Sequence, residues 1–252
     1  MVKGRSGRAT TGIEGLDEVL NGGFIQHRTY LIRGEAGTGK TILGLQYLLE
    51  GVKNDETCLF ITFSETEEQI NQNAQALGLN TKGVEILDLS PGSEKFTDEE
   101  TYDVFHPSEV EQEPIVEQIK EGVGQVEPER VFIDAITILR HLTNEQYQFR
   151  EQFLSLSKFL GNQGATVLFT SETSQQNPDT DLQFMADGII ELNRSDRSRA
   201  LTVNKFRGSN YQEGKHSLEI KNGGLEVSPW LVPEKAEEGF SKESLASGIP
   251  EV

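Results

Sequence analysis

The chain has 252 residues, of which 41 are acidic and 23 basic, so its formal net charge is −18. This length fits one large domain or two small ones, and no apolar run is long enough to predict a membrane span. The charge disfavours nucleic acid as a partner, because nonspecific binding depends on Lys and Arg neutralising phosphates. With one cysteine, Cys58, no apolar N-terminal signal segment and no zinc-ligand spacing, we expect a cytoplasmic protein without an internal disulfide.

Short apolar runs alternate with helical patterns, which predicts an α/β fold around a mostly parallel sheet. Several of the runs are almost continuously apolar, as is typical of strands with helices on both faces. The expected strands are Thr29–Arg33, Cys58–Phe63, Val84–Asp88, Val131–Asp134, Thr166–Ser171 and Gly188–Leu192. The helical patterns lie at Lys40–Val52, Glu65–Leu77, Pro114–Val123 and Asn144–Leu160.

After Arg194 the pattern changes to an alternation of apolar and polar residues. The segments RALTVNKF and HSLEIKNGGLEV predict C-terminal antiparallel strands, with a turn at Asn222-Gly223-Gly224. We expect one domain over residues 1–233 and a disordered tail over 234–252, which is polar and lacks apolar periodicity.

Acidic residues are concentrated between Glu94 and Glu129, a stretch that contains twelve acidic residues and two lysines. We interpret residues 94–129 as a solvated acidic surface insertion. A docking patch for a basic partner and adaptation to a salty cytoplasm are the alternatives.

The segment Gly34-Glu35-Ala36-Gly37-Thr38-Gly39-Lys40-Thr41 matches the phosphate-binding pattern G-x-x-x-x-G-K-[ST]. It follows an expected strand and opens an expected helix, as this motif requires. Glycines let backbone N–H groups converge on phosphate oxygens, and the helix N-terminus adds its positive dipole end. Lys40 can reach the β- and γ-phosphates, and the Thr41 hydroxyl can ligate Mg²⁺. The sequence therefore predicts a nucleotide site.

A carboxylate at the end of a neighbouring strand is expected to hold the Mg²⁺. The apolar strand Arg130-Val131-Phe132-Ile133-Asp134 has this form, and Asp88 at the end of VEILD is the competing candidate. We favour Asp134 because a small residue and Thr137 follow it. Thr41 and Asp134 are the predicted metal ligands.

With these motifs, the sequence resembles the RecA-like ATPases, and among them the KaiC-type domains. The resemblance spans most of residues 10–230. It is carried by Thr11-Gly12-Ile13-Glu14-Gly15-Leu16-Asp17 through Gly22-Gly23, by Phe60-Ile61-Thr62-Phe63-Ser64-Glu65, by Met185-Ala186-Asp187-Gly188-Ile189-Ile190 and by Lys205-Phe206-Arg207-Gly208-Ser209.

The resemblance implies a homo-oligomeric ring, usually a hexamer, with ATP and Mg²⁺ between neighbouring subunits. Lys205 and Arg207 would then reach across the interface as an arginine finger, since side chains two residues apart on a strand point the same way. A solvated pair on an edge strand is the alternative. The implied nucleotide contacts are Glu35, Ala36, Gly37, Thr38, Gly39, Lys40, Thr41, Ile42, Ser64, Asp134, Ser171, Lys205, Phe206, Arg207 and Ser209, and the implied catalytic residues are Lys40, Glu65, Lys205 and Arg207.

Two departures bear on activity. The family's paired glutamates are Ser64-Glu65 here, and a serine hydroxyl cannot serve as the general base at neutral pH. We expect slow hydrolysis with Glu65 involved, although Glu65 could instead be a first-turn acid of the next helix. Residues 182–187 lack the Ser-Thr pair of the clock proteins, so an autokinase is not expected.

At Thr170-Ser171-Glu172 either hydroxyl could sense phosphate or cap the next element of the chain. The leading hypothesis is a nucleotide-dependent assembly or signalling switch that docks an unidentified regulatory protein. One alternative is a DNA-recombination accessory resembling RadA and RadB, although its DNA-loop position, residues 175–183, has two aspartates and no cation. The other is a non-hydrolysing scaffold that uses ATP as a structural ligand.

Overall fold

The computed structural model describes residues 7–90, 113–141, 146–172 and 179–230. Within these ranges none of the helices is long and apolar enough to cross a bilayer. In chain order the elements are β1 (Arg8–Ala9), α1 (Leu16–Val19), β2 (Phe24–Ile25), β3 (Thr29–Gly34), α2 (Lys40–Lys53), β4 (Cys58–Thr62), α3 (Glu67–Ala76), β5 (Val84–Asp88), α4 (Glu113–Val126), β6 (Arg130–Asp134), α5 (Thr137–His141), α6 (Gln146–Asn162), β7 (Thr166–Glu172), α7 (Thr180–Met185), β8 (Gly188–Arg194), β9 (Arg199–Phe206), β10 (His216–Lys221) and β11 (Gly224–Ser228).

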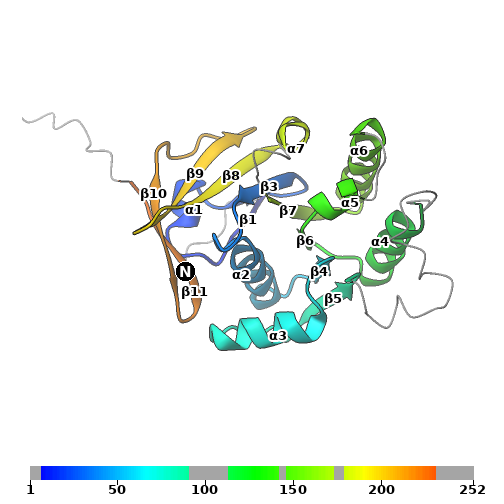
Figure 1. The fold of residues 1–252 in the computed structure, drawn as a ribbon, viewed down its shortest axis with the longest axis horizontal. Helices are drawn as coiled ribbons and strands as arrows, with labels where there is room; N and C mark the ends of the chain where they lie inside the picture. Colours follow the sequence, from blue (N-terminus) through cyan, green and yellow to red (C-terminus); the bar gives the residue numbers. More distant parts are fainter. Residues whose placement is uncertain (1–6, 91–112, 142–145, 173–178, 231–252) are drawn as a thin grey trace, which may run out of the picture.

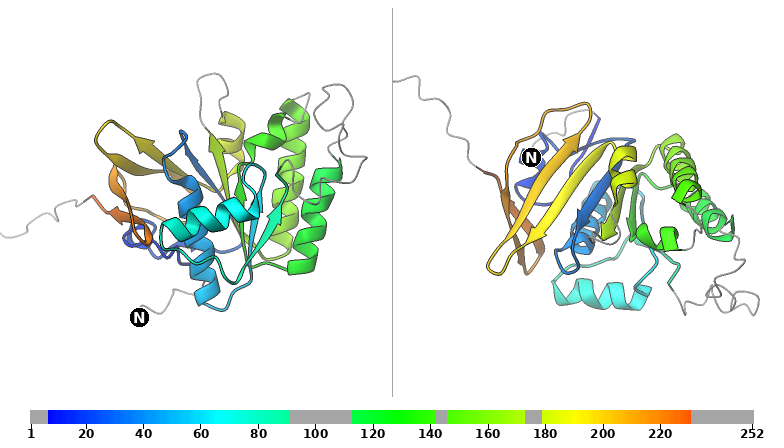
Figure 2. Two further views of the ribbon diagram at one scale, coloured as in Figure 1. Left: turned by 60° about the horizontal axis from the view of Figure 1, so that its bottom comes forward. Right: turned by 45° about the horizontal axis from the view of Figure 1, so that its top comes forward.

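The described elements form a nine-stranded sheet in the order β11-β10-β9-β8-β3-β7-β6-β4-β5 (Figure 1). The strands from β8 to β5 pair in parallel, whereas β9, β10 and β11 continue the sheet in antiparallel pairs. This is the α/β architecture that the sequence predicts. Figure 2 shows the antiparallel strands, in yellow and orange, at one end of the sheet.

Alternating side chains of the parallel strands belong to two separate hydrophobic cores, one on each face of the sheet. On β6, Phe132 packs in the core under α2, while its neighbours Val131 and Ile133 lie in the core under α4 and α6. The same alternation on β4 places Phe60 apart from Leu59. Since successive residues of a strand point to opposite faces, a continuously apolar strand needs helices on both sides, and both faces are covered.

The expected strands and helices are all present, with end points that differ by a few residues. The expected strand Val84–Asp88 matches β5, and the expected helix Glu65–Leu77 is shorter, over Glu67–Ala76. Antiparallel pairing joins β10 to β11 through the turn at Asn222 and Gly223. The expected tail, residues 234–252, lies outside the described residues.

The second half of the acidic stretch is helix α4, and it belongs to the core. Ile119 and Val123 are completely buried, and Ile115 and Val116 are nearly so. The interpretation of residues 94–129 as one solvated insertion is therefore wrong for this half, because α4 presents an apolar face to β4 and β5. Residues 94–112 lie outside the described residues.

The glycine-rich lead-in before β3 packs against the far end of the chain. Gly15 has φ of +80°, and a Cβ there would lie 1.8 Å from the carbonyl oxygen of Val227 in β11. A side chain cannot be accommodated at that approach. The contact attaches α1 to the antiparallel end of the sheet.

Candidate functional site

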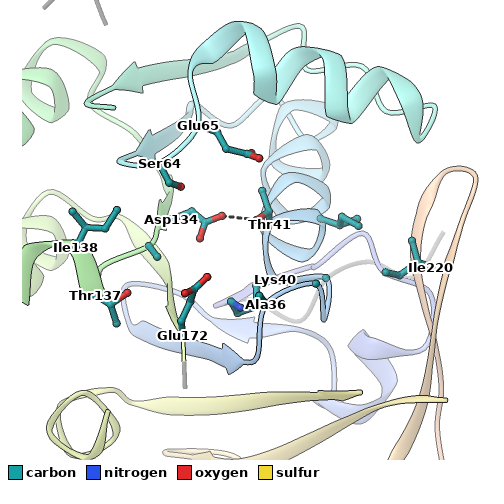
Figure 3. A pocket seen from close by; sticks show the side chains of 14 residues that line it. Ala36, Lys40, Thr41, Ser64, Glu65, Asp134, Thr137, Ile138, Glu172 and Ile220 are labelled. Atoms are coloured by element: carbon teal, nitrogen blue, oxygen red, sulfur yellow. Dashed lines mark hydrogen bonds between the residues drawn. The ribbon is translucent and has the colours of Figure 1, made fainter. Parts of the chain in front are cut away.

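The carboxyl ends of parallel strands β3, β4, β6 and β7 surround a pocket of about 540 Å³ (Figure 3). Loops that leave parallel strands emerge at the same edge of the sheet, where α/β folds bind ligands. The pocket is lined by Ala36, Gly37, Gly39, Lys40, Thr41, Ile42, Ser64, Glu65, Asp134, Ala135, Thr137, Ile138, Glu172 and Ile220.

The loop between β3 and α2 is built on glycines with positive φ. These angles are +154° at Gly34, +75° at Gly37 and +108° at Gly39, in a region that L side chains rarely adopt. The 14-residue helix α2 begins at Lys40, directly at the pocket. Its N-terminal N–H groups lack intrahelical partners and add a positive dipole end. This arrangement suits an anion.

The Lys40 side chain is folded back onto its own loop. Its ammonium donates to the carbonyl oxygens of Gly34 and Glu35, both at 2.9 Å. Burial lowers the pKa of Lys40, while the carboxylates of Glu172 and Asp134 favour its charged form. A phosphate in the pocket would add to that electrostatic support. Lys40 is therefore placed to exchange loop carbonyls for phosphate oxygens.

Thr41 and Asp134 meet at the centre of the pocket. The Thr41 hydroxyl donates to Oδ2 of Asp134 at 2.5 Å, and the Thr170 hydroxyl donates to Oδ1. Asp88 instead ends β5 away from the pocket, where it accepts hydrogen bonds from Ser90. The structure thus places Asp134, and not Asp88, beside Thr41.

The oxygens of Thr41 and Asp134 are the kind of ligands that Mg²⁺ prefers. In the described part of the chain, no group of three or more His, Cys, Asp or Glu side chains could hold a metal ion by itself. Mg²⁺ usually binds through one or two protein oxygens and completes its shell with phosphate oxygens and water. The donor set therefore fits a magnesium nucleotide.

Ser64 and Glu65 follow β4 and also line the pocket (Figure 3). Burial and then the negative charge of Asp134 raise the pKa of Glu65. The Asn73 side chain donates to Oε1 of Glu65 at 3.2 Å and so orients the carboxylate. Glu65 thus brings an oriented carboxylate to this side of the pocket.

Helix α3 starts after Glu65. Thr66 is its N-cap and forms a capping box with Gln69, so Glu67 and Glu68 are the acids of the first turn. The alternative interpretation of Glu65 as a first-turn acid is wrong, because Glu65 precedes the N-cap Thr66 and the helix begins at Glu67.

The hydroxyls at the end of β7 have different partners. Thr170 faces Asp134, whereas the Ser171 hydroxyl donates to Asp179 at 2.6 Å. Neighbouring residues of a strand point to opposite faces. The structure therefore places Thr170, but not Ser171, in contact with the pocket carboxylate.

Four predicted site residues lie near the opposite end of the strands from the phosphate-binding loop. They are Lys205, Phe206, Arg207 and Ser209. Phe206 of β9 pairs with Gly188 of β8, which pairs with Tyr30 of β3. Tyr30 precedes Gly34 by four residues, or about 13 Å along a strand. These predicted site residues cannot meet Lys40 within one chain.

Each of these four residues has local contacts. Lys205 donates to the carbonyl oxygens of Gln183 and Phe184, and the Phe206 ring stacks on Tyr30 with centroids 5.6 Å apart. The Arg207 side chain is 55% exposed and lies 3.7 Å from Asp187. The Ser209 hydroxyl accepts a hydrogen bond from Arg8.

The structure also shows pocket residues that the sequence prediction missed. Glu172 lies close enough to Lys40 to favour its charge, and the T-S-E pattern at the end of β7 could have indicated it. Ile220 comes from β10, and no local pattern predicts that this strand passes beside the loop. Thr38, a predicted contact, instead closes the loop by donating to the carbonyl of Glu35, whose side chain is exposed.

This fold and site define a P-loop nucleotide-binding protein with a RecA-like sheet. The KaiC ATPase family matches residues 9–231. The chain therefore belongs to the KaiC family of ATPases, for which ATP is the expected nucleotide.

The relatives are of two kinds. A UPF0273 protein of Methanopyrus kandleri is 30% identical over 236 residues, with 88% of this chain and 92% of the relative covered. A UPF0273 protein of Thermotoga maritima is 30% identical, with 88% and 96% covered. The circadian clock oscillator protein KaiC of Parathermosynechococcus lividus is 28% identical, but the match covers 87% of this chain and only 42% of that protein. This chain thus spans less than half of the clock protein.

The first prediction separates the two strand-end carboxylates. Asp134→Asn should weaken Mg²⁺-dependent ATP binding about tenfold or more, because a charged ligand of the cation is lost, while binding in EDTA should change little. Asp88→Asn is the matched control and should bind as the parent does. Fluorescent ATP titrations with and without Mg²⁺ measure both. An equal loss in the two variants would contradict the assignment of Asp134.

Proposed function

We propose that this protein is an ATP-binding, slowly hydrolysing ATPase that acts as a nucleotide-dependent assembly and signalling switch, with ATP at its subunit interfaces. The separation of the pocket from Lys205 and Arg207 carries this proposal. A nucleotide held by Lys40 has no arginine from this pair within its own chain. A second copy can supply one.

Binding uses the groups at the carboxyl edge of the sheet. Lys40 and the amides of the loop would hold phosphate oxygens, and Thr41 and Asp134 would hold Mg²⁺, which neutralises phosphate charge when bound. All of these groups belong to one chain, so nucleotide binding does not require a neighbouring subunit. Binding can therefore precede assembly.

Two different surfaces support a head-to-tail ring. The pocket edge of one subunit would face the Lys205 and Arg207 edge of the next, which makes the contact heterologous, and heterologous contacts close into rings when the rotation allows. The cations would stabilise negative charge on the terminal phosphate of the neighbour's nucleotide. By linkage, ATP that bridges two subunits favours the assembled state. The hexamer and the unidentified regulatory partner remain parts of this proposal.

Hydrolysis would depend on Glu65. Its carboxylate lines the pocket, and its raised pKa suits a general base better than the Ser64 hydroxyl does. Orientation by Asn73 from the side is consistent with one fixed carboxylate. Ser64 is also the observation that favours the second candidate function, a scaffold that binds ATP without turning it over.

The second prediction tests the shared site by mixing subunits. Lys40→Ala subunits lack phosphate binding, and subunits with Lys205→Ala and Arg207→Ala lack the cations, so each preparation alone should release little phosphate. Where a Lys40→Ala subunit offers its cations to the nucleotide of a subunit that lacks them, the interface joins an intact pocket to intact cations. Phosphate release should therefore reappear on mixing.

The control for this experiment removes a different lysine, Lys120. Lys120 lies on the surface of α4, where it pairs with Glu117, and Lys120→Ala should keep its activity without mixing. If mixed subunits stay as inactive as the separate ones while all bind to one another, the trans arrangement is contradicted.

The third prediction concerns the base. Because the pKa of Glu65 lies above its ordinary value of 4.5, its basic form is lost as the pH falls through that raised value, and phosphate release should fall with it. Glu65→Gln should remove this pH dependence and slow release about 100-fold. Glu67→Gln, an exposed acid two residues away, is the matched control and should change neither.

Ser64→Glu provides the complementary test. A carboxylate beside Glu65 should speed phosphate release well above the parent, measured against Lys40→Ala as the blank. If the parent rate equals that blank while ATP still binds, the scaffold function replaces the hydrolysing one.

A further inference from the structure

Helix α7 has polar contacts with elements of the pocket and also with Lys205, which lies away from the pocket. Its N-terminal end carries two almost completely buried carboxylates, since Asp179 is 1% exposed and Asp181 is 2% exposed. Buried carboxylates require partners, and their partners lie on two different elements that form the nucleotide site.

Asp179 is paired with Arg33. The guanidinium of Arg33 donates to Oδ2 from Nε at 3.1 Å and to Oδ1 from Nη2 at 3.0 Å. Arg33 is the last residue before Gly34, where the phosphate-binding loop leaves β3. This two-point contact fixes the start of α7 relative to the loop.

The Ser171 hydroxyl adds a third contact to Asp179. Ser171 follows Thr170, which donates to the pocket carboxylate Asp134. Ser171, a predicted nucleotide contact, thus contacts the N-cap of α7. It connects the pocket end of β7 with Asp179.

Asp181 is paired with Arg140 of α5, and Arg150 of α6 lies 3.9 Å away. Helix α5 follows β6 and also carries Thr137 and Ile138, which line the pocket. A second ion pair therefore attaches α7 to the pocket from the other side.

The C-terminal end of α7 holds Lys205. Its ammonium donates to the carbonyl oxygens of Gln183 at 2.9 Å and Phe184 at 3.2 Å. The Gln183 side chain reaches back and donates to Oδ1 of Asp179 at 2.7 Å. Arg33, Asp179, Gln183 and Lys205 thus form one continuous chain of polar contacts.

One residue of helix α7 is an exposed aromatic. The Phe184 ring is 74% exposed, beside the backbone carbonyl that holds Lys205. The exposed Phe184 ring and Lys205 therefore share this part of the surface.

We propose that Asp179 and Asp181 are positioning residues that hold α7 so that Lys205 is presented to the neighbouring subunit's nucleotide. The proposal rests on the proposed function, and it assigns to each subunit a physical link from its own pocket to the cation it offers. A displacement of about 1 Å at a reacting centre is costly for catalysis, so the fixed carbonyls of α7 have a direct use.

Mixing subunits tests this positioning role. A residue that only stabilises the fold would affect donor and acceptor subunits equally, whereas a positioning residue should affect the donor alone. Lys40→Ala subunits can only donate cations, and subunits with Lys205→Ala and Arg207→Ala can only hold nucleotide. Asp179→Asn is placed either on the donor or on the acceptor. We expect complemented phosphate release to fall about tenfold when it is on the donor and to stay within twofold when it is on the acceptor.

Two further variants control for folding and for loss of charge. Gln183→Met removes the side-chain contact from Gln183 to Asp179 within the α7 segment but keeps both partners of the Arg33–Asp179 ion pair, and it should show the same donor-only loss. Glu191→Gln removes the other partner of Arg33, which lies 3.3 Å away on β8, and it should be neutral on either subunit.

The outcomes separate the two proposals. If the unmodified donor and acceptor fail to complement, the trans site falls and this inference falls with it. If they complement but Asp179→Asn and Gln183→Met act equally on both subunits, or on the acceptor alone, the trans site stands and the positioning role is overturned.

Discussion

Strand direction is the constraint on which the rest of this molecule depends. Six parallel strands among the described residues end at one edge of the sheet and bring the loop, Asp134 and Glu65 together there. Strand β9 runs the other way, so its last residues, including Lys205, finish near the amino ends of β8 and β3. The groups that bind phosphate and the cations that could stabilise it are therefore separated within one chain. Under the proposed function, a second chain would bring them together.

The charged side chains that line the pocket are Lys40 and three carboxylates, those of Glu65, Asp134 and Glu172. Lys40 is buried among Glu172 and Asp134, and it uses loop carbonyls as partners. Asp134 accepts two hydroxyl hydrogen bonds. The site thus holds hydrogen-bond donors and oxygen ligands that a magnesium nucleotide could take over without a large rearrangement. Such a prepared site reduces the cost of ordering on binding.

The fold and the centre of the site could be predicted from sequence because they depend on local patterns. The apolar runs predict the strands, and the spacing from Gly34 to Thr41 predicts the loop between strand and helix. The family resemblance drawn from these motifs is confirmed by the match over residues 9–231.

The remaining features depend on contacts between distant residues, which local patterns do not encode. Part of the acidic stretch is helix α4, and one face of this helix is buried because its apolar positions outweigh its charge in deciding where it packs. The direction of the Ser171 hydroxyl follows from strand pleating and from Asp179, eight residues away. The approach of Ile220 to the loop requires the whole antiparallel end of the sheet. The nucleotide contacts assigned to Lys205 and Arg207 stay predictions, since one chain cannot display them.

The central claim is that ATP joins neighbouring subunits, and the particle mass tests it most directly. Sedimentation velocity of the 28.0 kDa chain should show a shift to a multiple of that mass when saturating Mg·ATP is added, and Lys40→Ala should show no shift. A parent protein that binds ATP and keeps the mass of a single chain would contradict the account.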